Sequence, residues 1–255
     1  MAEKAVVRFH GRVLPEFMQV TINFTPTVHW KADELGYEVD IVCRVDKSVI
    51  DIECILSHWK VEHFPDLYRR ALDIVRAKID VVGFKMACGL TVLLDTFEAP
   101  DGSVTPIALN APYLEGICTA FSLDKGFDEV CMQVLRRPLL FMAIRELMTA
   151  ISLPHVSLVE CARAMDRIKN TLAPPGSKDK AAWNRMRETL RIDEAYLKYI
   201  TDASADPRHG QPGHTPGSVT TEVTRRAWII MNRYLEYIVH GEKPLDPAAY
   251  PILDR

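Results

Sequence analysis

Residues 206–214 hold the side chains of this sequence that are best suited to bind or transform a ligand. They read Asp-Pro-Arg-His-Gly-Gln-Pro-Gly-His. Arg208 offers a planar set of N–H donors that fits a phosphate or a carboxylate. His209 and His214 can serve as acid, base or ligand near neutral pH. Arg208, His209 and His214 are therefore the candidates for catalysis.

The same segment is expected to be a loop between two long helices, because it is rich in glycine and proline. Functional residues concentrate in such loops, so we expect Arg208, His209 and Gly210 to bind a ligand. The alternative is a connector without a site, in which Arg208 pairs with a nearby carboxylate such as Asp202 or Asp206.

A second candidate lies about forty residues earlier, in the stretch Arg-Ala-Met-Asp at 163–166. Arg163 and Asp166 are three positions apart and fall on one face of a predicted helix. Together they are expected to hold a ligand or a loop against the helices. The alternative is an ordinary ion pair on the surface.

Metal and cofactor sites are not predicted. His58 and His63 have four residues between them, as do His209 and His214, but neither pair has a third ligand nearby in the sequence. A nucleophile motif of the Gly-x-Ser-x-Gly type is absent, and residues 83–89 lack the Gly-Lys-Ser/Thr ending of a phosphate loop.

The composition is that of a globular protein that does not bind nucleic acid through bulk charge. The net charge is −3 and charged residues make up 25%. Six scattered cysteines without a Cys-x-x-Cys pair indicate reduced thiols and a cytoplasmic protein; a Cys43–Cys54 bridge is the alternative. No apolar run approaches the roughly 20 residues of a membrane span, so no membrane partner is expected.

The elements that must position the candidate residues follow from hydrophobic periodicity. Alternation with period two predicts strands in the first 60 residues, and an antiparallel hairpin turns at Asp46 and Lys47. The predicted strands include residues 18–24, 37–45, 50–56, 91–97 and 104–109. A helix begins near Pro65 and is expected to end at Gly89.

From about residue 126 the period becomes that of helices, predicted at 126–134, 137–152, 155–172, 180–190, 193–203 and 218–240. Strands first and helices afterwards predict an α+β fold. We expect a β-rich α+β domain at 1–118, a helical bundle at 119–240 and an extended tail at 241–255 that docks loosely or not at all.

The Arg-Ala-Met-Asp helix, a tryptophan helix and Arg-His-Gly before a last long helix resemble the HEPN superfamily over residues 136–240. The resemblance is to bacterial HEPN-like proteins with a β-rich N-terminal part. It implies binding of RNA or nucleotides, or metal-independent cleavage of RNA by an arginine and a histidine four to six residues further on. Arg208 and His214 have five residues between them, and Arg233 and His240 have six.

Three functions remain open. The first is a HEPN-like binding protein without catalysis, for RNA, a nucleotide or a protein partner. It is favoured because glycine and proline between Arg208 and His214 exclude a continuous helix. The second is a metal-independent endoribonuclease of a stress or phage-defence system, with His209 or His214 as base. The third is an interaction protein without a small-molecule site, forming a homodimer through its long last helix.

Overall fold

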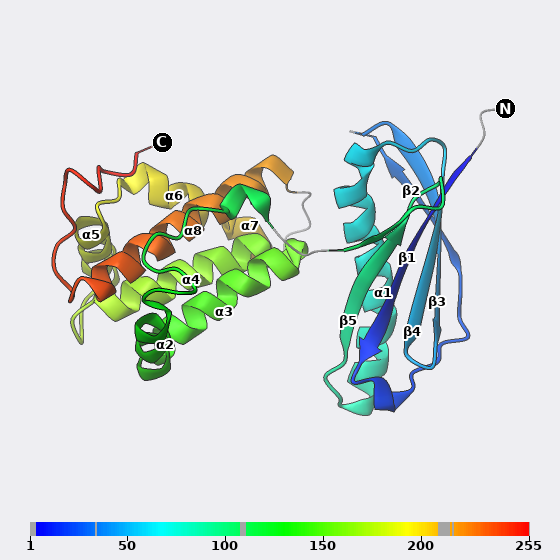
Figure 1. Cartoon of the computed structure of the whole chain (residues 1–255), viewed down its shortest axis with the longest axis horizontal. Coiled ribbons are helices and arrows are strands. Elements are labelled where there is room, and N and C mark those ends of the chain that lie inside the picture. Colours follow the sequence, from blue (N-terminus) through cyan, green and yellow to red (C-terminus); the bar gives the residue numbers. More distant parts are fainter. Residues whose placement is uncertain (1–3, 34, 108–110, 209–214, 216, 255) are drawn as a thin grey trace. The chain divides into compact units, whose positions relative to one another are not determined.

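The computed structural model describes residues 4–33, 35–107, 111–208, 215 and 217–254. The chain has an α+β fold and divides into two compact units, Met1–Ala108 and Leu109–Arg255 (Figure 1). The division falls ten residues before the expected one at 118/119. Among the described helices, none has the length and apolar sequence needed to cross a membrane.

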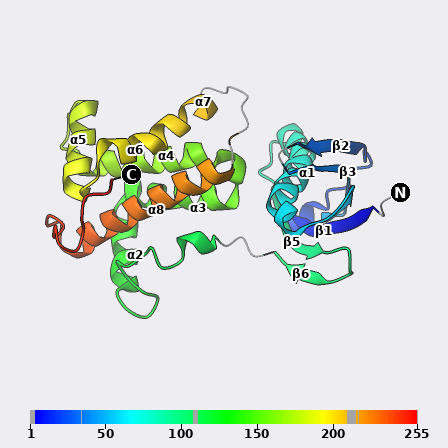
Figure 2. The ribbon, with the colours of Figure 1, turned by 90° about the horizontal axis from the view of Figure 1, so that it is seen from above.

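The N-terminal unit is a six-stranded antiparallel sheet in the order β2-β3-β4-β1-β5-β6. One helix, α1 (Phe64–Met86), packs against it (Figures 1 and 2). The apolar side chains of α1 and of the strands form one core. The strands are β1 (Ala5–Leu14), β2 (Thr27–Ala32), β3 (Tyr37–Asp46), β4 (Val49–Leu56), β5 (Thr91–Glu98) and β6 (Val104–Pro106).

The hairpin between β3 and β4 is confirmed, and its turn residues Lys47 and Ser48 both have positive φ. The strand expected at 18–24 is wrong. A 3-10 helix (Glu16–Met18) ends there at Gln19, whose φ of 46° breaks the extended run, and Ile22 makes only an isolated bridge to Val45. Likewise α1 ends at Met86 and is capped by Ala87 in a left-handed conformation, so it does not reach Gly89.

Gly11 sits at a bulge in β1 opposite β5, where the pairing shifts between His10 and Gly11. A Cβ atom added at Gly11 would lie 2.0 Å from the carbonyl oxygen of Leu93. Only glycine permits this close approach of the two backbones. The bulge therefore depends on this residue.

Charged side chains cover the sheet face opposite the core. Arg8 pairs with Glu53 and Glu98, each at 3.0 Å, and Arg12 pairs with Asp95 at 2.8 Å. Cys43 and Cys54 lie on the buried face as free thiols, opposite Ile52 and Ile41 and not each other. Burial raises the pKa of Cys54 to about 12, as expected for an inert core thiol.

The C-terminal unit is a bundle of helices, and the six helices expected from the sequence are confirmed to within about two residues. They are α2 (Phe127–Arg136), α3 (Pro138–Ser152), α4 (Ser157–Leu172), α5 (Asp179–Leu190), α6 (Glu194–Ala203) and α8 (Gly217–Val239). A short helix, α7 (Ala205–Arg208), stands where the sequence predicted loop.

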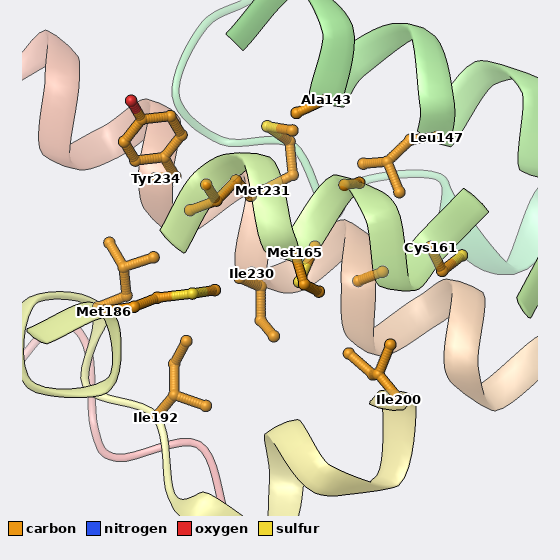
Figure 3. Packing of buried hydrophobic residues seen from close by; sticks show 14 of the residues in the cluster. Ala143, Leu147, Cys161, Met165, Met186, Ile192, Ile200, Ile230, Met231 and Tyr234 are labelled. Atoms are coloured by element: carbon orange, nitrogen blue, oxygen red, sulfur yellow. The ribbon is translucent and has the colours of Figure 1, made fainter. Parts of the chain in front are cut away.

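Helices α4 and α8 lie at the centre of this bundle, and their side chains pack against those of α3, α5 and α6 (Figure 3). Met165 of α4 and Ile230 of α8 are fully buried there. The wide apolar stripe of α8 is thus covered inside its own unit. That stripe is not free to form the homodimer expected through this helix, and the dimer itself stays a prediction.

The segment after α8 packs against the bundle, so the expectation of a loose tail was wrong. Leu245 is buried, and Leu253 exchanges backbone hydrogen bonds with Arg191 and Asp193 at the α5–α6 turn. The reason is the buried guanidinium of Arg233, which donates to the carbonyl oxygens of Leu190, Arg191 and Pro251. One cation thereby ties α8, the α5–α6 turn and the tail together.

Candidate functional site

A polar cleft with a volume of about 640 Å³ opens between α4, α5, α6 and α7. We call it the α4–α7 cleft. Five of its lining side chains are cationic, namely Lys169, Lys180, Arg187, Lys198 and Arg208, and three are carboxylates, namely Asp166, Asp179 and Glu194. Trp183, Asn184, Leu197 and Thr201 complete the lining. The cleft therefore carries an excess of positive charge.

Two of the residues predicted to bind a ligand meet in this cleft. The Nη2 atom of Arg208 donates to Oδ2 of Asp166 over 3.1 Å. The helix α7 holds Arg208 in place, since its backbone N–H donates to the carbonyl oxygen of Ser204. The partner of Arg208 thus comes from α4, and the pairing with Asp202 or Asp206 that a plain connector would show is not observed.

Lys169 is the most buried cation of the cleft, with 7% of the residue exposed. Its Nζ atom donates to Asp166 over 3.1 Å and to Asp179 over 2.6 Å, and lies 4.5 Å above the ring of Trp183. Burial alone would lower the pKa of Lys169, but the two carboxylates outweigh it and the pKa is raised. Lys169 is therefore a fixed positive charge in the buried part of the cleft.

The opposite wall is built around Arg187. Its Nη1 atom donates to Glu194 over 2.5 Å, which holds the pKa of that carboxyl below its usual range, and Lys198 lies 3.6 Å from the same residue. The Nε atom of Arg187 is buried without an acceptor. Lys180 makes no ion pair within the described part of the chain. Among the described residues of the cleft, the ammonium group of Lys180 thus remains available to a ligand.

Arg163 does not take part in the cleft. Its side chain is 57% exposed and pairs with Glu160 at 2.9 Å, although Asp166 follows only one helical turn later. The expected partnership of Arg163 with Asp166 is replaced by two separate pairs on α4. His209, Gly210 and His214 lie outside the described residues, directly after Arg208 in the chain.

The histidine pair of the N-terminal unit has a structural environment. His63 is buried, its ring stacks on Tyr37 with centroids 4.5 Å apart, and its Nδ1 atom accepts the backbone N–H of Lys60. Burial lowers the pKa of His63. His58 meets it edge to face at 5.3 Å. Within the described ranges no cluster of three metal-ligating side chains occurs.

Residues 7–108 match the family model described as the N-terminal domain of DUF8168, a domain of unknown function. Residues 128–239 match its C-terminal domain. The chain carries both domains of the DUF8168 family. The two DUF8168 matches fall one in each compact unit, so the α4–α7 cleft belongs to the C-terminal domain. No curated protein and no solved structure shows significant similarity to the chain.

The DUF8168 descriptions name no activity and no relation to HEPN proteins. The chemistry of the DUF8168 C-terminal domain must therefore be argued from its own geometry. Its cleft offers fixed cations and free N–H donors, which suits the binding of an anion. None of the described residues that line it is a histidine, so the groups there that could act as a base are the carboxylates Asp166, Asp179 and Glu194.

Proposed function

We propose that the C-terminal domain is a HEPN-like binding module that holds a phosphate-bearing ligand, an RNA end or a nucleotide, in the α4–α7 cleft. The observation that carries this proposal is the position of Arg208. Its guanidinium is held by Asp166 in one cleft with Lys169, Arg187 and Lys180. Arginine and lysine together are the side chains that proteins use to bind phosphate groups.

The carboxylates of the cleft hold some of its cations in place. This favours specific binding of one group over non-specific electrostatic attraction of any anion. Asp166 and Asp179 fix Lys169, and Glu194 fixes Arg187. A ligand would therefore place its phosphate at the remaining donors, near Arg208 and Lys180. Trp183 lies at the same wall and offers an aromatic edge to a base.

Binding is tested with the full chain and two probes of related chemistry. These are a short single-stranded RNA with a 3′-phosphate, compared with the same RNA ending in a hydroxyl, and ADP compared with adenosine. We expect the phosphorylated member of a pair to bind more tightly at low salt, and Arg208→Ala to weaken that binding by about tenfold. Added salt should reduce the affinity as counterions compete.

The matched control is Arg163→Ala. It removes an arginine from the same region of α4 without touching the cleft, so it should leave the affinity unchanged. Equal affinity for phosphorylated and unphosphorylated probes would reject the proposal. An equal loss in Arg163→Ala and Arg208→Ala would reject it too, because the effect would then be one of net charge alone.

The alternative function, a metal-independent endoribonuclease, rests on the two histidines that follow Arg208. Incubation of the chain with total RNA and a chelator is the assay. Cleavage that is lost in His209→Ala or His214→Ala would turn the binding site into an active site with that residue as base. Absence of cleavage, or cleavage that survives both changes, would reject this alternative. The predicted homodimer is checked by light scattering on the same sample.

A further inference from the structure

An apolar pocket with a volume of about 570 Å³ lies among α2, α3 and α8, three helices that contact one another (Figure 2). The proposed function does not use it. We call it the α2–α8 pocket. Its volume falls within the roughly 300–1,000 Å³ that is typical of small-molecule sites.

The pocket is a hollow that reaches into the core. Its floor is made by core side chains that are at most 6% exposed, Val130, Leu147, Met231 and Leu235. Its rim consists of side chains that are 41–76% exposed, Phe127, Leu135, Phe141 and Met148. A flat partner surface would cover the rim but leave the floor empty, so the shape favours a compact occupant that enters the hollow.

The lining also determines the charge of the occupant. Of the residues that the structure describes, no Asp, Glu, Lys, Arg or His lines the pocket, and the single amide is that of Asn232. The Oδ1 atom of Asn232 accepts the backbone N–H groups of Thr119 and Ala120. Its Nδ2 atom donates one N–H to the Thr119 hydroxyl, which leaves one N–H for a ligand. A charged ligand would lose its hydration here without a compensating partner.

The chemistry of the walls points to a ring system. Four aromatic side chains line the pocket, Phe121, Phe127, Phe141 and Trp228. Thioethers and thiols stand beside them, at Met148, Met231, Cys118 and Cys131. Aromatic edges and polarisable sulfur atoms pack favourably on the faces of other rings.

We propose that the α2–α8 pocket is a binding site for an uncharged, largely apolar small molecule that contains rings and at most one hydrogen-bond acceptor. The acceptor meets the free amide N–H of Asn232. The rings fill the space between the phenylalanines of the rim and the floor. This site is independent of the α4–α7 cleft.

The test uses N-phenyl-1-naphthylamine, titrated into the full chain. It is an uncharged fluorophore with three aromatic rings that brightens in apolar surroundings. We expect saturable binding with a blue shift. Cys131→Phe places a ring in the hollow and should weaken binding by about tenfold or more. Met132→Phe makes the same kind of change one residue further along α2, outside the lining, and should bind like the unmodified chain.

Circular dichroism would reveal misfolding of Cys131→Phe, and in that case a second variant tests the pocket. Met148→Glu adds a charge at the exposed rim and should also abolish binding. A chain that does not bind the probe, or variants that bind it unchanged, overturns the proposal. A dimer seen by light scattering and broken by Met148→Glu overturns it as well, because a second copy would then be the occupant.

Discussion

The guanidinium of Arg208 and the carboxylate of Asp166 meet at 3.1 Å although the residues are 42 positions apart. Their side chains are 34% and 37% exposed. Ion pairs with this much solvent contact contribute little to stability, at most about 1 kcal/mol. The pair therefore matters for the placement of Arg208 in the cleft more than for the fold.

The first prediction follows from that exposure. Arg208→Ala should change the free energy of unfolding by no more than about 0.5 kcal/mol, while it weakens binding of the phosphorylated probe. Urea unfolding of the variant and of the unmodified chain provides the measurement. A loss of several kcal/mol would contradict the prediction, because Arg208 would then be a structural residue of the bundle.

The second prediction concerns Glu146 of α3, which is buried and whose Oε2 atom has no hydrogen-bond partner. Burial raises the pKa of Glu146, and the Nε atom of Arg167, 3.3 Å from Oε1, only partly opposes this. The protonated carboxyl therefore favours the folded state. That contribution is complete below the unfolded pKa and is lost as the pH rises through the folded pKa.

Glu146→Gln should accordingly stabilise the chain by about 1 kcal/mol near pH 8 and by little near pH 4. Urea midpoints at the two pH values give the comparison. Glu188→Gln removes the same charge from an exposed position of α5, and serves as the control. An equal gain in both variants would attribute the effect to net charge and not to burial of Glu146.

The third prediction concerns the β1 bulge. Gly11→Ala should destabilise the N-terminal unit by about 3 kcal/mol, because the new methyl group meets the Leu93 carbonyl oxygen and the strands must separate. Gly89→Ala is the matched control, since a Cβ atom there meets nothing within 4 Å. Thermal unfolding, monitored by circular dichroism, measures the stability of both variants. Equal effects of the two changes would contradict this account of the bulge.

The fourth prediction concerns Arg233. Arg233→Met should cost about 2–3 kcal/mol, because three carbonyl oxygens lose a charged donor inside the bundle. Arg225→Met lies on the same helix, where the arginine is 43% exposed and pairs with Glu222, and should cost far less. Urea unfolding compares the two. Similar costs would mean that the three hydrogen bonds of Arg233 add no more stability than an exposed ion pair does.

The fold could be predicted from the sequence wherever a regular pattern decided it. The helices of the C-terminal unit follow apolar stripes such as that of Trp183, Met186 and Leu190, and the β3–β4 hairpin follows strict alternation. Residues 18–24 also alternate, yet no strand forms, because the backbone turns at Gln19. Periodicity reports which side chains are buried, but it does not report where a left-handed residue interrupts the chain.

The candidate site could be predicted only in part. Arg208 was predicted because it lies in a segment rich in glycine and proline, and Asp166 because it shares a helix face with Arg163. Their pairing depends on how α4 and α7 pack, which residue spacing in the sequence does not reveal. Lys169 was missed, although Asp166 and Lys169 are three positions apart on one helix, a spacing that suits an ion pair. The α2–α8 pocket left no signal, because its lining looks like any apolar stripe.

The bonds between Leu253 and the α5–α6 turn have a consequence for how the protein is made. During synthesis α4, α5 and α6 leave the ribosome well before residue 253. Until that residue emerges, the turn that joins two walls of the α4–α7 cleft lacks its backbone partners, and Arg233 lacks one of its three acceptors. Chains that end between residues 208 and 253 would thus contain every side chain of the cleft and still lack the bonds that hold this turn.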